Sequence, residues 1–152
     1  MTTKIAIVTG VSRLQGIGYA ICTEPTTLLA LEFVRRFQFE KGGRIINLTS
    51  GQSLGEMSSE VAYALTKGAA ETLTCTISQR LAKQGITINA VNPGPTDTGW
   101  MNAELEAEIL AKSPMGRIGL PADAARLIGF LASDEAEWVT GQVIHSEGGF
   151  TR

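Results

Sequence analysis

Short β-branched runs alternate with helical stretches along the chain, and this alternation limits the possible folds more than any other feature. The first run, Lys-Ile-Ala-Ile-Val-Thr, is unbroken and is typical of a strand buried on both faces of a parallel sheet. Strands that alternate with helices predict a doubly wound α/β sheet of the Rossmann type, not an all-helical or all-β domain. Four strands are predicted: residues 4–9, 44–50, 86–91 and 139–146.

The stretches between these runs carry apolar residues at helical spacing. The longest, residues 59–84, repeats an aliphatic or alanine residue every fourth position and is followed by Gly85, a residue suited to a helix end. Its apolar side contains Val61, Leu65, Ala69, Leu73, Ile77 and Leu81. Further helices are predicted over residues 26–39, 102–111 and 121–132, the last with Pro121 in its first turn.

The sequence between the first two predicted strands is short for this fold, so we expect that an internal segment is missing near Glu24-Pro25. Because proline disfavours the helical conformation in the residue before it, we expect one helix to stop there and another to start at residue 26. The chain has 152 residues and four predicted strands, whereas an α/β domain of this kind often has about 200 to 250 residues. We expect one domain over residues 1–152. The sequence leaves open whether the protein lacks the segment or only the sequence printed here does.

Composition excludes several classes of function. With 13 Lys+Arg against 15 Asp+Glu and a net charge of -2, the chain has no basic surface suited to nucleic acid. Its apolar runs are too short to span a bilayer, and the N-terminus lacks the pattern of a signal peptide. One histidine and 2 cysteines do not form a metal-binding cluster. We therefore predict a cytoplasmic protein without metal, nucleic-acid or membrane partners.

A glycine-rich turn, Thr-Gly-Val-Ser-Arg-Leu-Gln-Gly-Ile-Gly, joins the first strand to the helix after it. Glycines let the backbone approach a pyrophosphate, and a helix N-terminus supplies free N–H donors. The same turn can serve close strand–helix packing without a ligand, but its position favours dinucleotide binding. The candidate cofactor-binding residues here are Gly10, Ser12, Arg13, Gln15, Gly16, Ile17 and Gly18.

Tyr63 and Lys67 are one helical turn apart and lie on the same side of the long helix. An ammonium group near a phenol stabilises the phenolate and lowers the pKa of the phenol, which makes Tyr63 a candidate general acid or base. An isolated Tyr/Lys pair is more often an ordinary helix surface. Ser50 strengthens the functional interpretation because it follows a buried strand, where open α/β sheets bind their ligands.

Together these features resemble the short-chain dehydrogenase/reductase family over almost the whole chain. The resemblance is greatest to bacterial 3-oxoacyl-[acyl-carrier-protein] reductases. It implies an oxidoreductase that uses NAD or NADP to transfer a hydride between nicotinamide and a carbonyl or alcohol carbon, with 3-oxoacyl-thioester reduction as one such reaction. The matching features are the TG(x)nGIG turn, the spacing of Ser50 and Tyr63, Tyr63-x-x-x-Lys67, Asn92-Pro93-Gly94 and Gly141-Gln142…Gly148-Gly149.

The resemblance also implies roles for individual residues. Tyr63 would exchange a proton with the substrate oxygen, Ser50 would orient that oxygen, and Lys67 would assist Tyr63 and bind the nicotinamide ribose. A small-molecule or acyl-thioester substrate and a homo-oligomer, dimer or tetramer, are implied as well. The segment expected beside the nicotinamide and phosphates contributes Pro93, Gly94, Thr96 and Thr98.

The chain departs from the family in two ways. Five residues instead of the usual three separate Gly10 from Gly16, and the missing segment would hold both the family's catalytic Asn and the residue that selects NAD or NADP. Arg13 suits a 2′-phosphate and slightly favours NADP. The alternative is an inactive family member that serves assembly or ligand binding, against which the complete Ser50, Tyr63 and Lys67 set argues.

Overall fold

The computed structural model describes residues 5–9 and 18–151, with side chains for residues 26–151. Over these residues the chain alternates between strands and helices, as the sequence predicts. The elements are β1 (Ile5–Thr9), α1 (Gly18–Arg36), β2 (Gly43–Leu48), η1 (Ser58–Glu60), α2 (Val61–Ala82), β3 (Ile86–Asn92), α3 (Ala103–Ala111), α4 (Pro121–Ala132), η2 (Asp134–Ala136) and β4 (Val143–His145).

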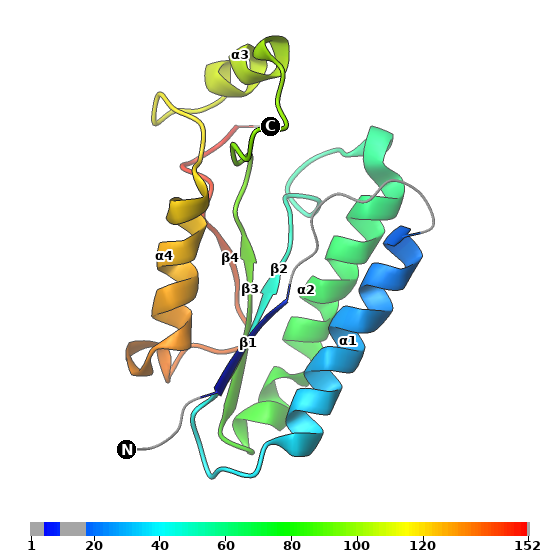
Figure 1. Ribbon diagram of the computed structural model, residues 1–152, viewed down its shortest axis with the longest axis vertical. Helices are drawn as coiled ribbons and strands as arrows, with labels where there is room; N and C mark the ends of the chain where they lie inside the picture. The colour runs from blue at the N-terminus through cyan, green and yellow to red at the C-terminus, as the bar shows by residue number, and fades with distance from the viewer. Residues whose placement is uncertain (1–4, 10–17, 152) are drawn as a thin grey trace.

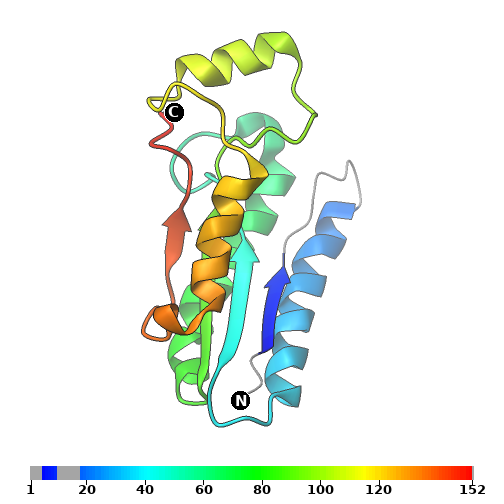
Figure 2. The ribbon, with the colours of Figure 1, turned by 60° about the vertical axis from the view of Figure 1, so that its left-hand side comes forward.

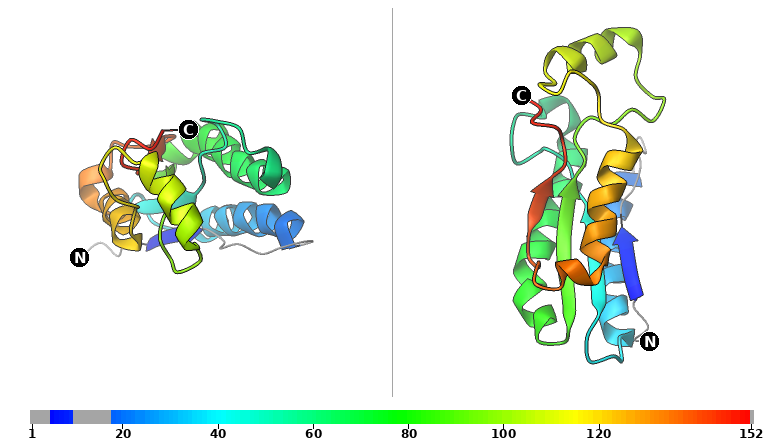
Figure 3. Two further views of the ribbon diagram at one scale, coloured as in Figure 1. Left: turned by 90° about the horizontal axis from the view of Figure 1, so that it is seen from above. Right: turned by 90° about the vertical axis from the view of Figure 1, so that its left-hand side faces the viewer.

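The described strands form one parallel sheet in the order β1-β2-β3-β4. Helices α1 and α2 cover one face of this sheet and α4 covers the other (Figure 1). The strands point toward the end of the molecule at which α3 lies (Figure 2), and from above α3 lies between α4 and α2 (Figure 3). This arrangement confirms the predicted Rossmann-like α/β fold.

Two apolar clusters hold the layers together, one on each face of the sheet. Neighbouring residues of β2 pack into different clusters, because successive side chains of a strand point to opposite faces of the sheet. Ile45 joins Ala30, Leu81, Ile86 and Ile88 below α1 and α2. Ile46 joins Val91, Leu131 and Ala136 below α4 and η2.

The predicted break at Pro25 was wrong, because α1 runs from Gly18 to Arg36 as one helix. Proline removes one intrahelical hydrogen bond, but its fixed φ is itself helical. A proline therefore does not exclude a helix, and the part of α1 that follows Pro25 packs into the core through Ala30. At the end of the loop after α1, Gly42 has a positive φ of 97° and turns the chain into β2.

Two other predictions, the length of the last strand and the apolar side of the long helix, were only partly right. The last strand covers Val143–His145 only, because Gly141 adopts a φ of 71° that extended backbone does not allow. The buried side of α2 differs from the predicted apolar side, because it consists of Lys67, Ala70, Thr74, Ser78 and Leu81, of which only Leu81 was predicted. Leu81 is 2% exposed, whereas Val61 and Leu65 near the start of the helix are 59% and 70% exposed.

Candidate functional site

The candidate site lies at the carboxyl edge of the sheet, where β2 and β3 end side by side. The backbone N–H of Thr49, just beyond β2, donates to the Val91 carbonyl of β3 at 2.9 Å. Ser50 follows Thr49, and the Pro93-Gly94 turn follows β3. The two chain segments with predicted functional residues therefore leave the sheet as neighbours.

Helix α2 brings Lys67 to this edge. The Lys67 ammonium donates to the Leu48 carbonyl at the end of β2, with 2.9 Å between Nζ and O. The same nitrogen lies 5.5 Å from the centre of the Tyr63 ring. Lys67 is only 9% exposed, so little water screens its charge. The structure thus places a buried cation beside a phenol, at the end of the strand that leads to Ser50.

A second residue of α2 fixes the start of the Ser50 segment. Thr49 is 2% exposed, and its hydroxyl donates to the Glu71 carboxylate at 2.9 Å. The Lys67 carbonyl lies 3.2 Å from the same hydroxyl. Lys67 and Glu71 are one helical turn apart, so one side of α2 holds Leu48 and Thr49 in place.

The turn after β3 has its own internal bonds. Gly94 has a positive φ of 64°, a conformation that residues with a Cβ rarely adopt. The Thr96 hydroxyl donates to the Gly94 carbonyl at 3.2 Å, and Thr96 forms a parallel bridge with Gly119. Thr98 is exposed at the same edge. The predicted nicotinamide segment is therefore a compact turn beside the Ser50 segment.

Comparison with known proteins identifies the family. A family model described as enoyl-(acyl carrier protein) reductase matches residues 20–151. The chain belongs to the short-chain dehydrogenase/reductase family. An uncharacterized oxidoreductase of Bacillus subtilis, YjdA, is 60% identical over 136 residues, which are 88% of this chain and 54% of that protein. The family predicted from the sequence is thereby confirmed.

Two other proteins refine the relationship. A 3-oxoacyl-[acyl-carrier-protein] reductase of Rickettsia felis is 36% identical over 125 residues, 80% of this chain and 52% of that protein. The structure of angucycline C-6 ketoreductase LanV with bound NADP superposes with a TM-score of 0.79 at 30% identity, covering 95% of this chain and 61% of LanV. This short-chain dehydrogenase/reductase spans about half the length of the curated relatives it matches. That difference is consistent with a missing segment.

The structure brings together one part of the residue set predicted for this short-chain dehydrogenase/reductase. Tyr63, Lys67 and the segments of Ser50 and Gly94 meet at the carboxyl edge. β1 ends at the same edge, because Thr9 is in register with Asn47 of β2. Gly18 is the first residue of α1. The remaining turn residues lie outside the described residues: Gly10, Ser12, Arg13, Gln15, Gly16 and Ile17.

The sequence analysis missed two polar residues that support this edge. Glu71 bonds Thr49, and its position one turn after Lys67 was the signal that could have revealed it. Glu147 bonds Asn92 at the end of β3. Glu147 and His145 both contact the Asn92 side chain, but Glu147 lies beyond β4, so strand periodicity could not have revealed it. Asn47 is fully buried and donates to Thr74, so it does not replace the family's catalytic Asn.

An ion pair secures the loop between α3 and α4, near the same edge. Arg117 donates to the Asp123 carboxylate at 2.7 Å, and the Leu120 N–H donates at 2.8 Å. The hydrogen bond from Arg117, followed by that from Leu120, lowers the pKa of Asp123 to about 2.

Within residues 26–151 no cluster of His, Cys, Asp and Glu could hold a metal. None of the described helices has the length and apolarity to cross a membrane.

Proposed function

We propose that this protein is an oxidoreductase that transfers a hydride between NAD(P) and a carbonyl or alcohol substrate. The buried Lys67 ammonium supports this most directly, because it lies between the end of β2 and the Tyr63 ring. Burying an ammonium costs free energy. A buried ammonium beside a phenol, at the edge where α/β sheets bind ligands, therefore indicates a functional role and favours proton transfer by the phenol.

The residues at this edge fit a nicotinamide cofactor by their chemistry. The Lys67 ammonium can donate to ribose hydroxyls, and the exposed Thr98 hydroxyl can donate to a phosphate. When bound, the nicotinamide supplies or accepts the hydride. We propose that the pyrophosphate and nicotinamide are held by the two turns that follow β1 and β3: Gly10, Ser12, Arg13, Gln15, Gly16, Ile17 and Gly18, and Pro93, Gly94, Thr96 and Thr98.

The catalytic residues in this proposal are Ser50, Tyr63 and Lys67. The Tyr63 hydroxyl gives a proton to the carbonyl oxygen during reduction and takes it back during oxidation. The positive charge of Lys67 stabilises the phenolate that remains on Tyr63. Ser50 donates a hydrogen bond to the substrate oxygen and stabilises the negative charge that develops on it.

We further propose NADP as the preferred cofactor and a 3-oxoacyl thioester as a substrate. LanV has NADP bound, and a 3-oxoacyl-[acyl-carrier-protein] reductase is among the relatives. Arg13 supports NADP through its positive charge. The alternative of an inactive family member is not favoured, because the chain keeps Ser50, Tyr63 and Lys67 and its relatives are oxidoreductases.

A homo-oligomer is part of the proposal. A shallow groove on α2 is lined by apolar and small residues, among them Met57, Val61, Leu65 and Gly68. Val61 and Leu65 are more than half exposed, and an apolar surface of this kind is typical of a protein interface. Light scattering should give a multiple of the 16.1 kDa chain mass. A monomer would contradict this part of the proposal.

The variant Tyr63→Phe tests the proposed chemistry. It removes only the hydroxyl that exchanges the proton, so turnover should fall by about 10²- to 10⁴-fold. Affinity for NADPH should remain close to that of the wild type. The measurement is NADPH oxidation with an acetoacetyl thioester and with simple ketones, together with a fluorescence titration of NADPH. Equal turnover of variant and wild type, or no turnover of the wild type on any substrate, overturns the proposal.

A further inference from the structure

Asn92, the last residue of β3, connects the end of β4 to the turn after β3. It is 1% exposed. Its Nδ2 lies 2.9 Å from Glu147 Oε2 and 3.0 Å from His145 Nδ1. Its Oδ1 accepts the Gly94 N–H at 2.9 Å. One buried carboxamide therefore touches both the β4 segment and the proposed cofactor turn.

The direction of each bond follows from Gly94. A backbone N–H only donates, so the atom that faces it must be the carboxamide oxygen of Asn92. The amide nitrogen then donates one hydrogen to Glu147 and the other to His145. His145 consequently accepts at Nδ1 and carries its hydrogen on Nε2 when neutral. All hydrogen-bonding atoms of the Asn92 side chain are used.

The other end of this connection is itself anchored. Ser146 N–H donates to the Asn92 carbonyl at 2.7 Å, and Phe150 N–H donates to the Glu147 carbonyl at 3.1 Å. Farther along, Thr151 N–H donates to the Lys112 carbonyl after α3 at 3.0 Å. Gly94 packs so closely on Glu147 that a Cβ would overlap it. Glu147 is therefore a fixed support for the turn.

We propose that Asn92 is a positioning residue: it transfers the fixed position of Glu147 and His145 to Gly94 and so holds the Pro93-Gly94 turn ready for the nicotinamide. The link to the cofactor rests on the proposed function, whereas the link between Glu147 and Gly94 does not. A buried donor that loses its acceptor is costly. Misplacing this turn should therefore weaken NADPH binding about tenfold.

Asn89 provides a matched control on the same strand. It is also an asparagine with 1% exposure, and it also bonds the segment leading into β4. Its Nδ2 donates to the Val139 carbonyl at 2.9 Å and its Oδ1 accepts the Gln142 N–H at 3.1 Å. These bonds lie at the start of β4, away from the turn. Substitution of Asn89 should lower stability without changing the NADPH affinity of the folded protein.

The experiment compares Asn92→Asp, Asn89→Asp and Asn92→Asp combined with Glu147→Gln. Asn92→Asp places a carboxylate against Glu147, so NADPH affinity should fall about tenfold and the Gly94 amide should exchange with solvent about tenfold faster. In the double variant the introduced amide donates to the introduced carboxylate, and His145 donates to the same carboxylate once its ring hydrogen lies on Nδ1. Both values should return toward those of the wild type, and Glu147→Gln alone should change little.

The outcomes separate this inference from the proposed function. If the wild type does not bind NADPH, the proposed function fails, and the Gly94 exchange rate still tests the Asn92 connection. If Asn92→Asp matches the wild type in both measurements, or the double variant is not restored, the inference is wrong. Should Asn92→Asp not fold, Asn92→Ser and Asn89→Ser give the same comparison with a smaller perturbation.

Discussion

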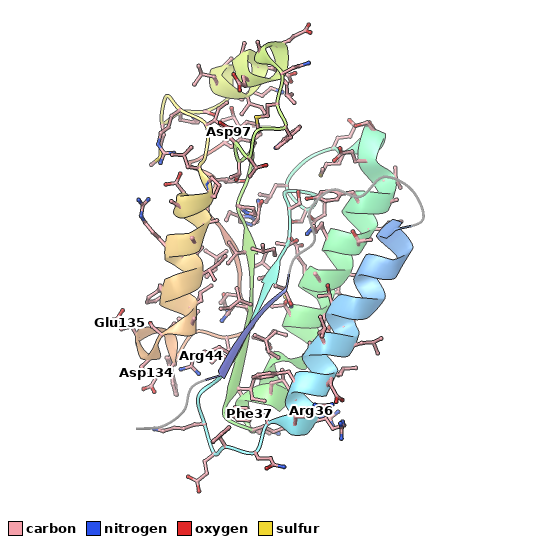
Figure 4. The ribbon with its side chains drawn as sticks, in the orientation of Figure 1. Arg36, Phe37, Arg44, Asp97, Asp134 and Glu135 are labelled. Atoms are coloured by element: carbon pink, nitrogen blue, oxygen red, sulfur yellow. The ribbon has the colours of Figure 1, made fainter. Side chains whose placement is uncertain are left out.

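Two buried cations lie at opposite ends of β2 and serve different purposes. At the amino end, Arg44 is 4% exposed and donates to the Gly43 carbonyl at 3.1 Å and the Ser133 carbonyl at 3.4 Å. Its guanidinium lies 3.9 Å from the Asp134 carboxylate (Figure 4). These bonds attach the strand to the segment after α4, so Arg44 joins two layers of the fold.

At the carboxyl end, Lys67 is similarly buried but has a different neighbour. Its ammonium donates to the Leu48 carbonyl and faces the ring of Tyr63, a group that can lose a proton. Burial and charge alone therefore do not distinguish a structural cation from a functional one. The two cations differ in the groups that they contact and in the edge of the sheet at which they lie. Open α/β sheets bind ligands at the carboxyl ends of their strands, and only Lys67 lies there.

Lys67→Met should have the largest effect on activity. The variant keeps the length of the side chain but removes the charge that stabilises the Tyr63 phenolate, so turnover should fall about 10²- to 10⁴-fold. The Leu48 carbonyl loses one hydrogen bond, so the free energy of unfolding should fall by only about 0.5–1.5 kcal/mol. Lys83→Met, at an exposed lysine just after α2, is the matched control. If Lys67→Met and Lys83→Met have equal turnover, the functional role proposed for Lys67 is wrong.

Arg44→Met should show the reverse behaviour. Loss of the bonds to Gly43 and Ser133 should lower the free energy of unfolding by about 1–3 kcal/mol. Turnover of the folded protein should stay near the wild-type value. Urea unfolding measures the first quantity and NADPH oxidation the second, with the exposed Arg80→Met as the control. A large loss of turnover without a loss of stability would contradict the structural role of Arg44.

Thr49→Val should have an effect of intermediate size. It tests whether the contact of Thr49 with α2 holds the Ser50 segment in place. It removes the hydroxyl that donates to Glu71, so Ser50 should lose its position and turnover should fall about tenfold. Thr49→Ser keeps the hydroxyl and should restore most of the activity. Thr74→Val is the control, since the fully buried Thr74 bonds Asn47 and Ala70 within the core. If Thr74→Val lowers turnover as much, Thr49 has no special role.

Helices and strands could be predicted from the sequence wherever a local pattern of residues determines where the element begins and ends. The predicted helices over residues 102–111 and 121–132 match α3 and α4 because capping residues and apolar spacing lie close together in sequence. Pro25 misled because proline disfavours helix in the residue before it, but its own φ is helical, and α1 continues through it. The exposed Val61 could not be foreseen, since helical spacing does not show how far α2 extends past the sheet.

The site was predictable only as far as its motif. Tyr63 and Lys67 are neighbours on one helix, so their spacing in sequence specifies their approach in space. The contact of Lys67 with Leu48 depends on how α2 packs on β2. Likewise, the bond between Asn92 and Glu147 depends on the register of β3 and β4. Contacts of this kind join residues far apart in the sequence, and no local pattern contains them.

Asp123→Asn should have the smallest effect. The ion pair of Asp123 with the exposed Arg117 contrasts with the buried cations Arg44 and Lys67. The hydrogen bonds from Arg117 and Leu120 lower the pKa of Asp123 from 3.8 to about 2. A carboxyl whose pKa is lower in the folded state stabilises the protein above its unfolded pKa and loses this contribution as pH falls through the folded value. The wild type should therefore lose stability relative to Asp123→Asn between pH 4 and about pH 2. Because Arg117 is about half exposed, added salt should reduce the difference. Urea unfolding of both proteins across this pH range checks the expectation, and parallel curves would show that the ion pair contributes nothing.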